Sequence, residues 1–233
     1  MNRITHTNAP NYTPELLKMA AVALMVLDHT GIVLDDNIIL RSLGRLALPL
    51  FVYQLTSGFL ASSNHIKTIK LLFIFALISY FPYNIFIQTN YLHNLINHLP
   101  IANHWNVFLP LAIAYSVLML IEAKKYVPML LLLLLPMLID MDYDWLIPAA
   151  SIAIYFILKS KMKKSVQWVA IFCTYFFLNF IYTLQIDAVW YQLIAPLGIP
   201  IAAILMKIDV KIRLPKLFYY WFYPIHLLIL KIL

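Results

Sequence analysis

Residues 16–34 read LLKMAAVALMVLDHTGIVL, a run that is long and apolar enough to cross a bilayer. The run nevertheless carries Lys18 near one end and the neighbouring pair Asp28 and His29 deep inside. A carboxylate in the hydrocarbon core costs at least about 2.5 kcal/mol, so an ionisable residue within a span is typical of a functional position. The alternative places Asp28 and His29 at the outer end of the helix, at the membrane interface.

The whole chain has the composition of a membrane protein. Of its 233 residues, 63% are hydrophobic and 12% are charged, whereas soluble domains average about 45–50% apolar and about 25% charged residues. The apolar runs are continuous, which favours helices over alternating strands. We therefore predict an all-α, polytopic transmembrane helix bundle. Its membrane segments, about nine in number, are 14–34, 44–63, 69–88, 106–122, 126–139, 145–158, 166–185, 190–206 and 217–232.

Two of these segments, 126–139 and 145–158, are short for a full crossing of about 20 residues. They are tilted or re-entrant. If neither crosses the membrane, two crossings are removed together, so the remaining loops stay on the same sides as before. Residues 1–13 form a polar N-terminal tail, and residues 14–233 form a single integral membrane domain.

The basic residues are distributed unevenly between the loops. The loops after the even-numbered segments carry Lys67, Lys70, Lys124, Lys125, Lys159, Lys161, Lys163, Lys164, Lys207, Lys211, Arg213 and Lys216. The loops after the odd-numbered segments hold Asp35, Asp36, Asp140, Asp142, Asp144 and Asp187. The positive-inside rule then places the N-terminus in the cytoplasm of a multi-pass protein of the inner (plasma) membrane. The net charge of +7 is accordingly a topology signal in contact with the lipid bilayer, and nucleic acid is not an expected partner.

Arg41 and Arg45 run against this bias, because they are the only basic residues of the early outer loops. Each is either a lipid-headgroup contact or part of a site. A lone buried carboxylate is costly, so we expect Asp28 to lie within ion-pair range of Arg41 or Arg45.

Lys18 and His29 are eleven positions apart, which is about three helical turns and ~16 Å along one face. We predict that they line one cavity, although Lys18 taken alone is an interfacial anchor paired with Glu15. His226, in YYWFYPIHLLIL, is a second intramembrane histidine at a similar depth. It is either a site residue or an anchor in the outer aromatic belt.

Other polar residues give weaker signals. Tyr53 and Ser57 belong to a polar cluster in the second segment, and some of this cluster should face the interior of the bundle. The histidines of YLHNLINHLPIANHW match no metal-ligand spacing, and the acidic run DMDYD at 140–144 is interpreted as a solvated turn. No metal is expected.

Four stretches carry a resemblance to a known family. LLKMAAVALMVLDHTG, LRSLGRLALPLFVY, SGF and FYPIHLLIL are similar to the TraX family. Members of that family are polytopic membrane proteins, and the founding type N-acetylates the N-terminus of conjugative pilin subunits. A wider resemblance is to membrane acyltransferases of the acyltransferase-three type. In these, a basic residue, ten intervening positions and a histidine mark the first helix, as Lys18 and His29 do here.

The resemblance implies an integral membrane acetyltransferase. Acetyl-CoA would be the donor, and the acceptor would be an amine, such as a pilin N-terminus, or a hydroxyl of a pilin-like protein or a glycan, extracytoplasmic or membrane-embedded. His29 would be the general base, with Asp28 and His226 as further catalytic residues. The residues expected to bind the donor are Lys18, Arg41 and Arg45. Those expected to bind the acceptor are Tyr53, Ser57 and Tyr223.

A function from another class is also compatible with these residues. A non-catalytic assembly or transport component could use a buried Asp–His–Arg cluster for helix docking or proton coupling. A tunnel bordered by His29 would favour acyl transfer, whereas a solid bundle would favour docking.

The charge asymmetry gives a first prediction, which concerns topology. A membrane-impermeant amine reagent should label Lys161 and Lys163 only from the cytoplasmic side, because the loop that carries them is predicted to lie inside. A matching thiol reagent should label an Asp142→Cys variant only from outside. Labelling of both positions from the same side would contradict the orientation.

Overall fold

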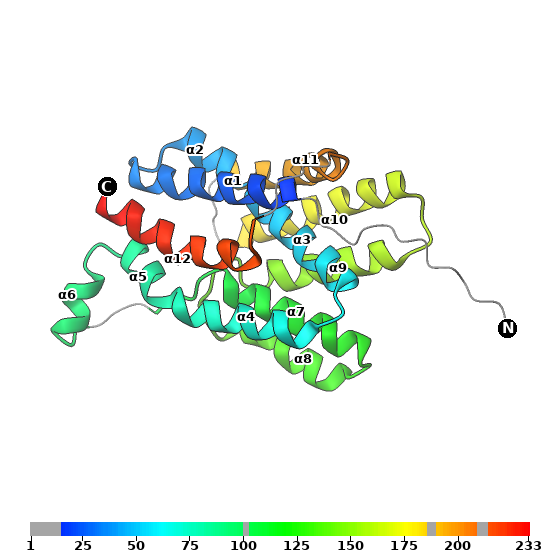
Figure 1. Cartoon of the computed structure of the whole chain (residues 1–233), viewed down its shortest axis with the longest axis horizontal. Coiled ribbons are helices and arrows are strands. Elements are labelled where there is room, and N and C mark those ends of the chain that lie inside the picture. Colours follow the sequence, from blue (N-terminus) through cyan, green and yellow to red (C-terminus); the bar gives the residue numbers. More distant parts are fainter. Residues whose placement is uncertain (1–14, 100–102, 186–189, 209–213) are drawn as a thin grey trace.

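The chain is described by a computed structural model over residues 15–99, 103–185, 190–208 and 214–233. The predicted polar tail, residues 1–13, lies outside this range. Within the described residues every named element is a helix, and the one β-type contact is an isolated bridge between Trp105 and Met141. The prediction of an all-α protein is therefore confirmed for these residues (Figure 1).

The helices follow the chain in this order: α1 (Glu15–Val33), α2 (Ile38–Gly44), α3 (Ala47–Ala61), α4 (His65–Ile78), α5 (Tyr80–Ile87), α6 (Tyr91–Ile96), α7 (Phe108–Glu122), α8 (Tyr126–Leu134), the 3-10 helix η1 (Leu135–Met137), α9 (Leu146–Lys159), α10 (Lys164–Gln185), the 3-10 helix η2 (Trp190–Leu197), α11 (Gly198–Leu205) and α12 (Lys216–Ile232). Each of the nine predicted segments coincides with one of these helices or with two consecutive ones.

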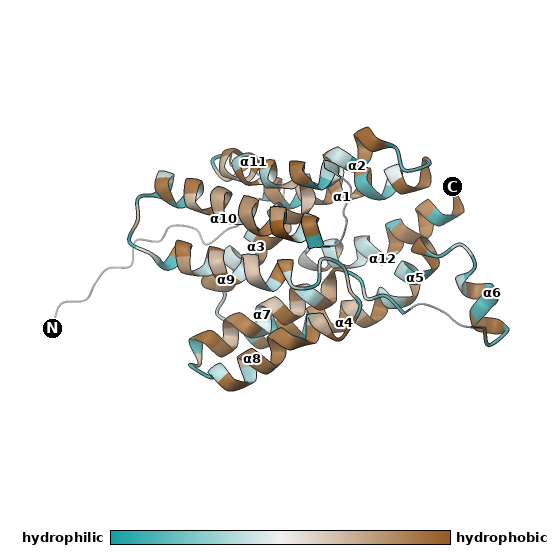
Figure 2. Ribbon diagram, turned by 180° about the vertical axis from the view of Figure 1, so that it is seen from behind, coloured by the Kyte–Doolittle hydropathy of each residue, from teal (hydrophilic) through white to brown (hydrophobic). Residues whose placement is uncertain are grey.

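Three helical stretches are long and apolar enough to cross a membrane by themselves. They are Glu15–Val33, Ile38–Ala61 and Lys164–Gln185, and α4 with α5 would make a fourth across a bend of 43°. The other apolar helices are shorter, at 10–17 residues. Hydrophobic residues cover most of the ribbon outside the loops (Figure 2), which is the character of a membrane protein. Nine full crossings and a cytoplasmic N-terminus remain predictions.

Prolines set where many of the helices begin. Six helices have a proline as their third residue, and these prolines are Pro49, Pro82, Pro110, Pro128, Pro148 and Pro200. The first turn of a helix has unpaired N–H groups, so a proline costs little there. The same ring clashes with the carbonyl four residues earlier, so a proline kinks or breaks a helix that would otherwise extend back through it. Pro82 thus explains the break between α4 and α5 at Ser79, and Pro49 explains the break at Arg45 and Leu46.

Two glycines allow a close helix contact near the C-terminal end of α1. A Cβ atom on Gly44 of α2 would lie 2.2 Å from Cβ of Asp28, and one on Gly31 of α1 would lie 2.9 Å from Cγ of Arg41. Larger residues would hold the helices apart at both points. The absence of a side chain therefore brings the two arginine-bearing turns directly against Asp28.

The C-terminal helix completes the surroundings of α1. α12 packs against α5 and against α1, so that the first and last described helices lie side by side (Figure 1). α3 crosses behind α1 and also contacts α7 and α9. This arrangement places the buried face of α12 opposite His29.

The contact at Gly44 gives a second prediction. Gly44→Ala should lower the free energy of unfolding by about 1–3 kcal/mol, because the new methyl group overlaps Asp28 and separates α1 from α2. Thermal unfolding in detergent measures the effect. Gly58→Ala is the matched control, since a Cβ there meets nothing within 4 Å. The control should keep or slightly raise the Tm, and a Gly44→Ala protein with the wild-type Tm would contradict the packing.

Candidate functional site

Asp28 lies between the two arginines of the α2 region. Its Oδ2 is 3.0 Å from Nη1 of Arg41, and its Oδ1 is 3.7 Å from Nε of Arg45. All three side chains are largely buried, at 12–14% exposed. The expectation of an ion pair is confirmed, and both arginines take part. Arg41 has a second carboxylate partner, because its Nε lies 3.6 Å from Oδ1 of the exposed Asp36.

Arg45 also contacts two tyrosines, which favours the interpretation as part of a site over a lipid-headgroup contact. Its Nη1 donates a hydrogen bond to the Oη of Tyr143 over 2.7 Å, and its guanidinium lies 5.4 Å from the ring centroid of Tyr191. A cation over an aromatic face is stabilised by the ring quadrupole. The arginine is therefore fixed on three sides, by Asp28, Tyr143 and Tyr191.

His29 and His226 form a direct pair. The Nδ1 of His29 lies 2.7 Å from the Nε2 of His226, although the residues are 197 positions apart. The Nδ1 of His226 lies 2.9 Å from the carbonyl oxygen of Phe222. His226 is buried, and this contact favours the interpretation as a site residue over an aromatic-belt anchor.

The hydrogen bonds of this pair assign the protons of the two neutral rings. A carbonyl only accepts, so Nδ1 of His226 carries a hydrogen and its Nε2 is an acceptor. The Nδ1 of His29 must then donate to that acceptor. The Nε2 of His29 is left with a free lone pair, and it makes no hydrogen bond within the described residues. Phe86 and Tyr223 contact the His29 ring edge to face, with centroids 5.4 and 6.1 Å away, and so restrict its rotation.

A cavity of about 270 Å³ lies beside these groups. Its wall includes the ion-pair cluster, His29 and polar residues from other parts of the chain. The polar lining residues are Asp28, His29, Arg41, Arg45, Tyr83, Asp142, Tyr143, Tyr182, Gln192 and Tyr223. We call this space the inner cavity. A candidate base and two arginines thus share one cavity.

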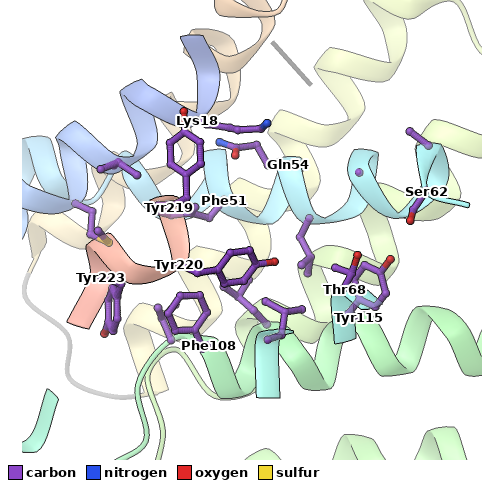
Figure 3. Close-up of a pocket in the computed structure, with 18 residues that line it drawn as sticks. Lys18, Phe51, Gln54, Ser62, Thr68, Phe108, Tyr115, Tyr219, Tyr220 and Tyr223 are labelled. Carbon is purple, nitrogen blue, oxygen red and sulfur yellow. The ribbon is translucent and has the colours of Figure 1, made fainter. Parts of the chain in front are cut away.

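A second cavity, of about 360 Å³, lies next to the first and holds Lys18 in its wall. Figure 3 shows Lys18 and Gln54 together at one edge, Thr68 and Tyr115 at another, and Tyr220 between them. We call this space the Lys18 cavity. Lys18 is the only charged residue in its described lining, and the Nζ of Lys18 is 3.1 Å from Oε2 of Glu15.

The prediction that Lys18 and His29 line one cavity is wrong. They line two neighbouring cavities. Both cavities share Met25, Phe51, Val107 and Tyr223 as wall residues. These side chains form the partition between the two spaces. Lys18 and His29 do lie along one side of α1, as the sequence indicated. Apolar and aromatic side chains divide the space on that side into two cavities.

The three expected acceptor-binding residues lie in different places. Tyr223 is buried and lines both cavities. Tyr53 stacks on Trp168 with ring centroids 4.7 Å apart, and the Oγ of Ser57 donates to the carbonyl of Gln54. Neither Tyr53 nor Ser57 is among the residues of the two cavities.

Comparison with known proteins gives a family. The family model described as TraX protein matches residues 13–233, almost the entire chain. The chain belongs to the TraX family. A comparison with curated proteins found no match, and a comparison with solved structures also found none.

In this TraX-family protein, sequence reasoning missed five polar residues of the inner cavity, which are Tyr83, Asp142, Tyr143, Tyr182 and Gln192. Asp142 and Tyr143 come from the acidic run DMDYD, which was interpreted as a solvated turn, and Tyr83 comes from α5. The Oη of Tyr83 donates to Oδ1 of Asp142 over 2.5 Å. The only signal available was a tyrosine embedded among aspartates, and nothing in the sequence indicated that this loop folds back over Arg45.

His104 connects this loop to the preceding one. Its Nε2 is 3.2 Å from Oδ1 of Asp142, and its Nδ1 is 2.8 Å from Oδ1 of Asp140. Partial burial lowers the pKa of His104, but hydrogen bonds and charge attraction from Asp142 and Asp140 outweigh it and raise the pKa to about 9. A protonated His104 therefore ties the two loops together next to the inner cavity.

The raised pKa gives a third prediction. The folded state binds the His104 proton more tightly than the unfolded chain, whose pKa is near 6.5. The stabilisation is complete below pH 6.5 and is lost as the pH rises to about 9, a change on the order of 2–3 kcal/mol. Unfolding of wild type and of His104→Gln in detergent should therefore differ more at pH 6.5 than above pH 9. An equal difference at both pH values would contradict this ion pair.

Proposed function

We propose that this TraX-family protein is an acyltransferase of the inner membrane. It transfers acetyl from acetyl-CoA to an amine or hydroxyl of an extracytoplasmic or membrane-embedded acceptor, a pilin-like protein or a glycan. The observation that supports this most is the free Nε2 of His29 in a cavity shared with Arg41 and Arg45. A base and fixed positive charges are what acyl transfer from a thioester requires.

The reaction divides between these groups. The Nε2 of His29 removes the proton from the acceptor nitrogen or oxygen as that atom attacks the thioester carbonyl. A new N–C or O–C bond forms, and the carbonyl electron pair moves onto oxygen. When the carbonyl reforms, the C–S bond breaks and CoA leaves as its thiolate, which takes up the proton that His29 carries.

His226 acts through His29. Its Nε2 accepts the hydrogen on Nδ1 of His29, which holds the ring in one tautomer and stabilises the positive charge that the ring gains. The Phe222 carbonyl holds His226 in turn. Asp28 restrains Arg41 and Arg45, whose guanidinium groups favour negative charge that develops beside them in the cavity.

The Lys18 cavity is suited to the donor. Aromatic and aliphatic side chains form most of its wall, which fits the thin pantetheine arm of CoA, and the Lys18 ammonium can pair with a phosphate. The cavity adjoins the inner cavity across a partition of four side chains. With the N-terminus in the cytoplasm, Lys18 lies at the side from which acyl-CoA arrives. The Lys18–His29 spacing supports a place in the acyltransferase-three superfamily.

The cavities also bear on the rival function. A component that uses Asp28 and its arginines only to dock helices needs close packing and no space beside the cluster. Two adjoining cavities of about 270 and 360 Å³ favour a protein that admits small molecules.

His29→Ala gives the fourth prediction. Purified protein in liposomes should transfer labelled acetyl from acetyl-CoA to an N-terminal pilin peptide, and His29→Ala should lower kcat at least about 100-fold by removing the base. Thermal stabilisation by CoA should persist in the variant, because the CoA arm occupies the Lys18 cavity and only the thioester end of the donor reaches His29.

His93→Ala is the matched control, since His93 is an exposed histidine of α6 that lines neither cavity. It should retain wild-type turnover. Full turnover by His29→Ala would remove His29 from the role of base. An absence of both CoA stabilisation and acetyl transfer in the wild-type protein would favour the docking component.

A further inference from the structure

Tyr143 occupies an unusual backbone position next to the ion-pair cluster. It has a φ of 55°, in the left-handed region that a bulky side chain rarely adopts. Such conformations persist only where the surroundings impose them, and they gather at functional sites. Tyr143 is half-buried, lines the inner cavity, and had no role in the sequence interpretation.

Backbone contacts from both sides impose this conformation. The N–H of Trp105 donates to the carbonyl of Asp140 over 3.0 Å, and the N–H of Asp142 donates to the carbonyl of Trp105 over 2.9 Å. On the other side, the carbonyl of Tyr143 accepts from the N–H of Leu146 over 2.9 Å. The loop is thus fixed before and after Tyr143, and the phenol is carried to Arg45.

The hydrogen bond to Arg45 decides what the phenol can still do. A guanidinium group only donates, so the Tyr143 oxygen is the acceptor in the 2.7 Å contact. A phenol has one hydrogen of its own. Within the described residues no carboxylate, carbonyl or hydroxyl accepts that hydrogen. Tyr83, in the same wall, differs because its O–H is already donated to Asp142.

We propose that the O–H of Tyr143 is an oxyanion donor of the transfer reaction. It donates a hydrogen bond to the carbonyl oxygen of the thioester as the acceptor attacks and negative charge forms there. The phenol keeps its proton throughout, and the bond weakens when the carbonyl reforms and the C–S bond breaks. Tyr143 is then a catalytic residue, and this role rests on the proposed acyl transfer.

Arg45 strengthens this donor without touching the substrate. A positive group bonded to the phenol oxygen draws electron density from it and polarises the O–H bond. Asp28 and Tyr191 hold the guanidinium in place, so the charge is oriented before substrate arrives. Preorganised donors of this kind contribute most in enclosed sites from which water is excluded.

Tyr143→Phe tests the role in full-length protein in liposomes. Loss of one oxyanion donor should lower kcat for acetyl transfer about 100-fold, while the KM for acetyl-CoA stays within about twofold. The trifluoromethyl ketone analogue of acetyl-CoA, whose hydrate mimics the tetrahedral intermediate, should bind more weakly by a similar factor. Affinity for CoA itself should not change.

Tyr175→Phe is the matched control, because it removes the hydroxyl of a buried tyrosine of α10 that lines neither cavity. It should retain wild-type kcat and analogue binding. If Tyr143→Phe does not fold, replacement by 3,5-difluorotyrosine keeps the ring and the hydroxyl. Its kcat should then fall on raising the pH, as the more acidic phenol ionises, along a limb absent from the wild-type profile.

The outcomes separate this inference from the function on which it rests. Wild-type kcat and analogue binding in Tyr143→Phe, with His29→Ala inactive, would overturn the donor role and leave acyl transfer intact. An unchanged pH profile in the difluorotyrosine protein would overturn it as well. A wild-type protein that transfers no acetyl would overturn both.

Discussion

The ion-pair cluster of Asp28, Arg41 and Arg45 is the interaction on which the arrangement of the site depends. A buried carboxylate must be compensated, and here the compensation comes from a helix that reaches it only because Gly44 has no side chain. The cluster joins α1 to α2 and fixes Arg45. Arg45 in turn binds Tyr143, so one charge pair positions side chains from two loops and two helices.

Two neighbouring residues of α1, Asp28 and His29, bond to different helices. His29 neighbours Asp28 in sequence but bonds to His226 of α12, while Asp28 bonds to α2. Adjacent residues on a helix point in different directions, and α1 uses this to build a charge cluster and a histidine pair in one cavity wall. The lone pair on Nε2 of His29 is free because the Phe222 carbonyl only accepts and so fixes the proton order along the histidine pair. The O–H of Tyr143 is free because the guanidinium of Arg45 only donates.

Sequence patterns predicted the parts of the fold that depend on local chemistry. Continuous apolar runs gave the helices, and the cost of a lone carboxylate gave the partners of Asp28. Wall residues such as Asp142 and Tyr143 were missed because their role depends on a loop that folds over a helix about one hundred positions earlier. The contact between His29 and His226 likewise requires α12 to pack on α1. The hydrophobic pattern of each segment does not indicate which helices pack together. The partition between the cavities depends on rotamers of Phe51 and Tyr223, and these are also beyond sequence reasoning.

The central claim is that this TraX-family protein transfers acetyl groups, and comparison of cells with and without its gene tests it most directly. Mass spectrometry of membrane proteins and surface polymers would be compared between wild type, a deletion strain and a strain that carries His29→Ala. If the protein transfers acetyl groups, a defined set of N-termini or hydroxyl groups should carry an acetyl mass shift only in wild type. Identical acetylation in all three strains would contradict it.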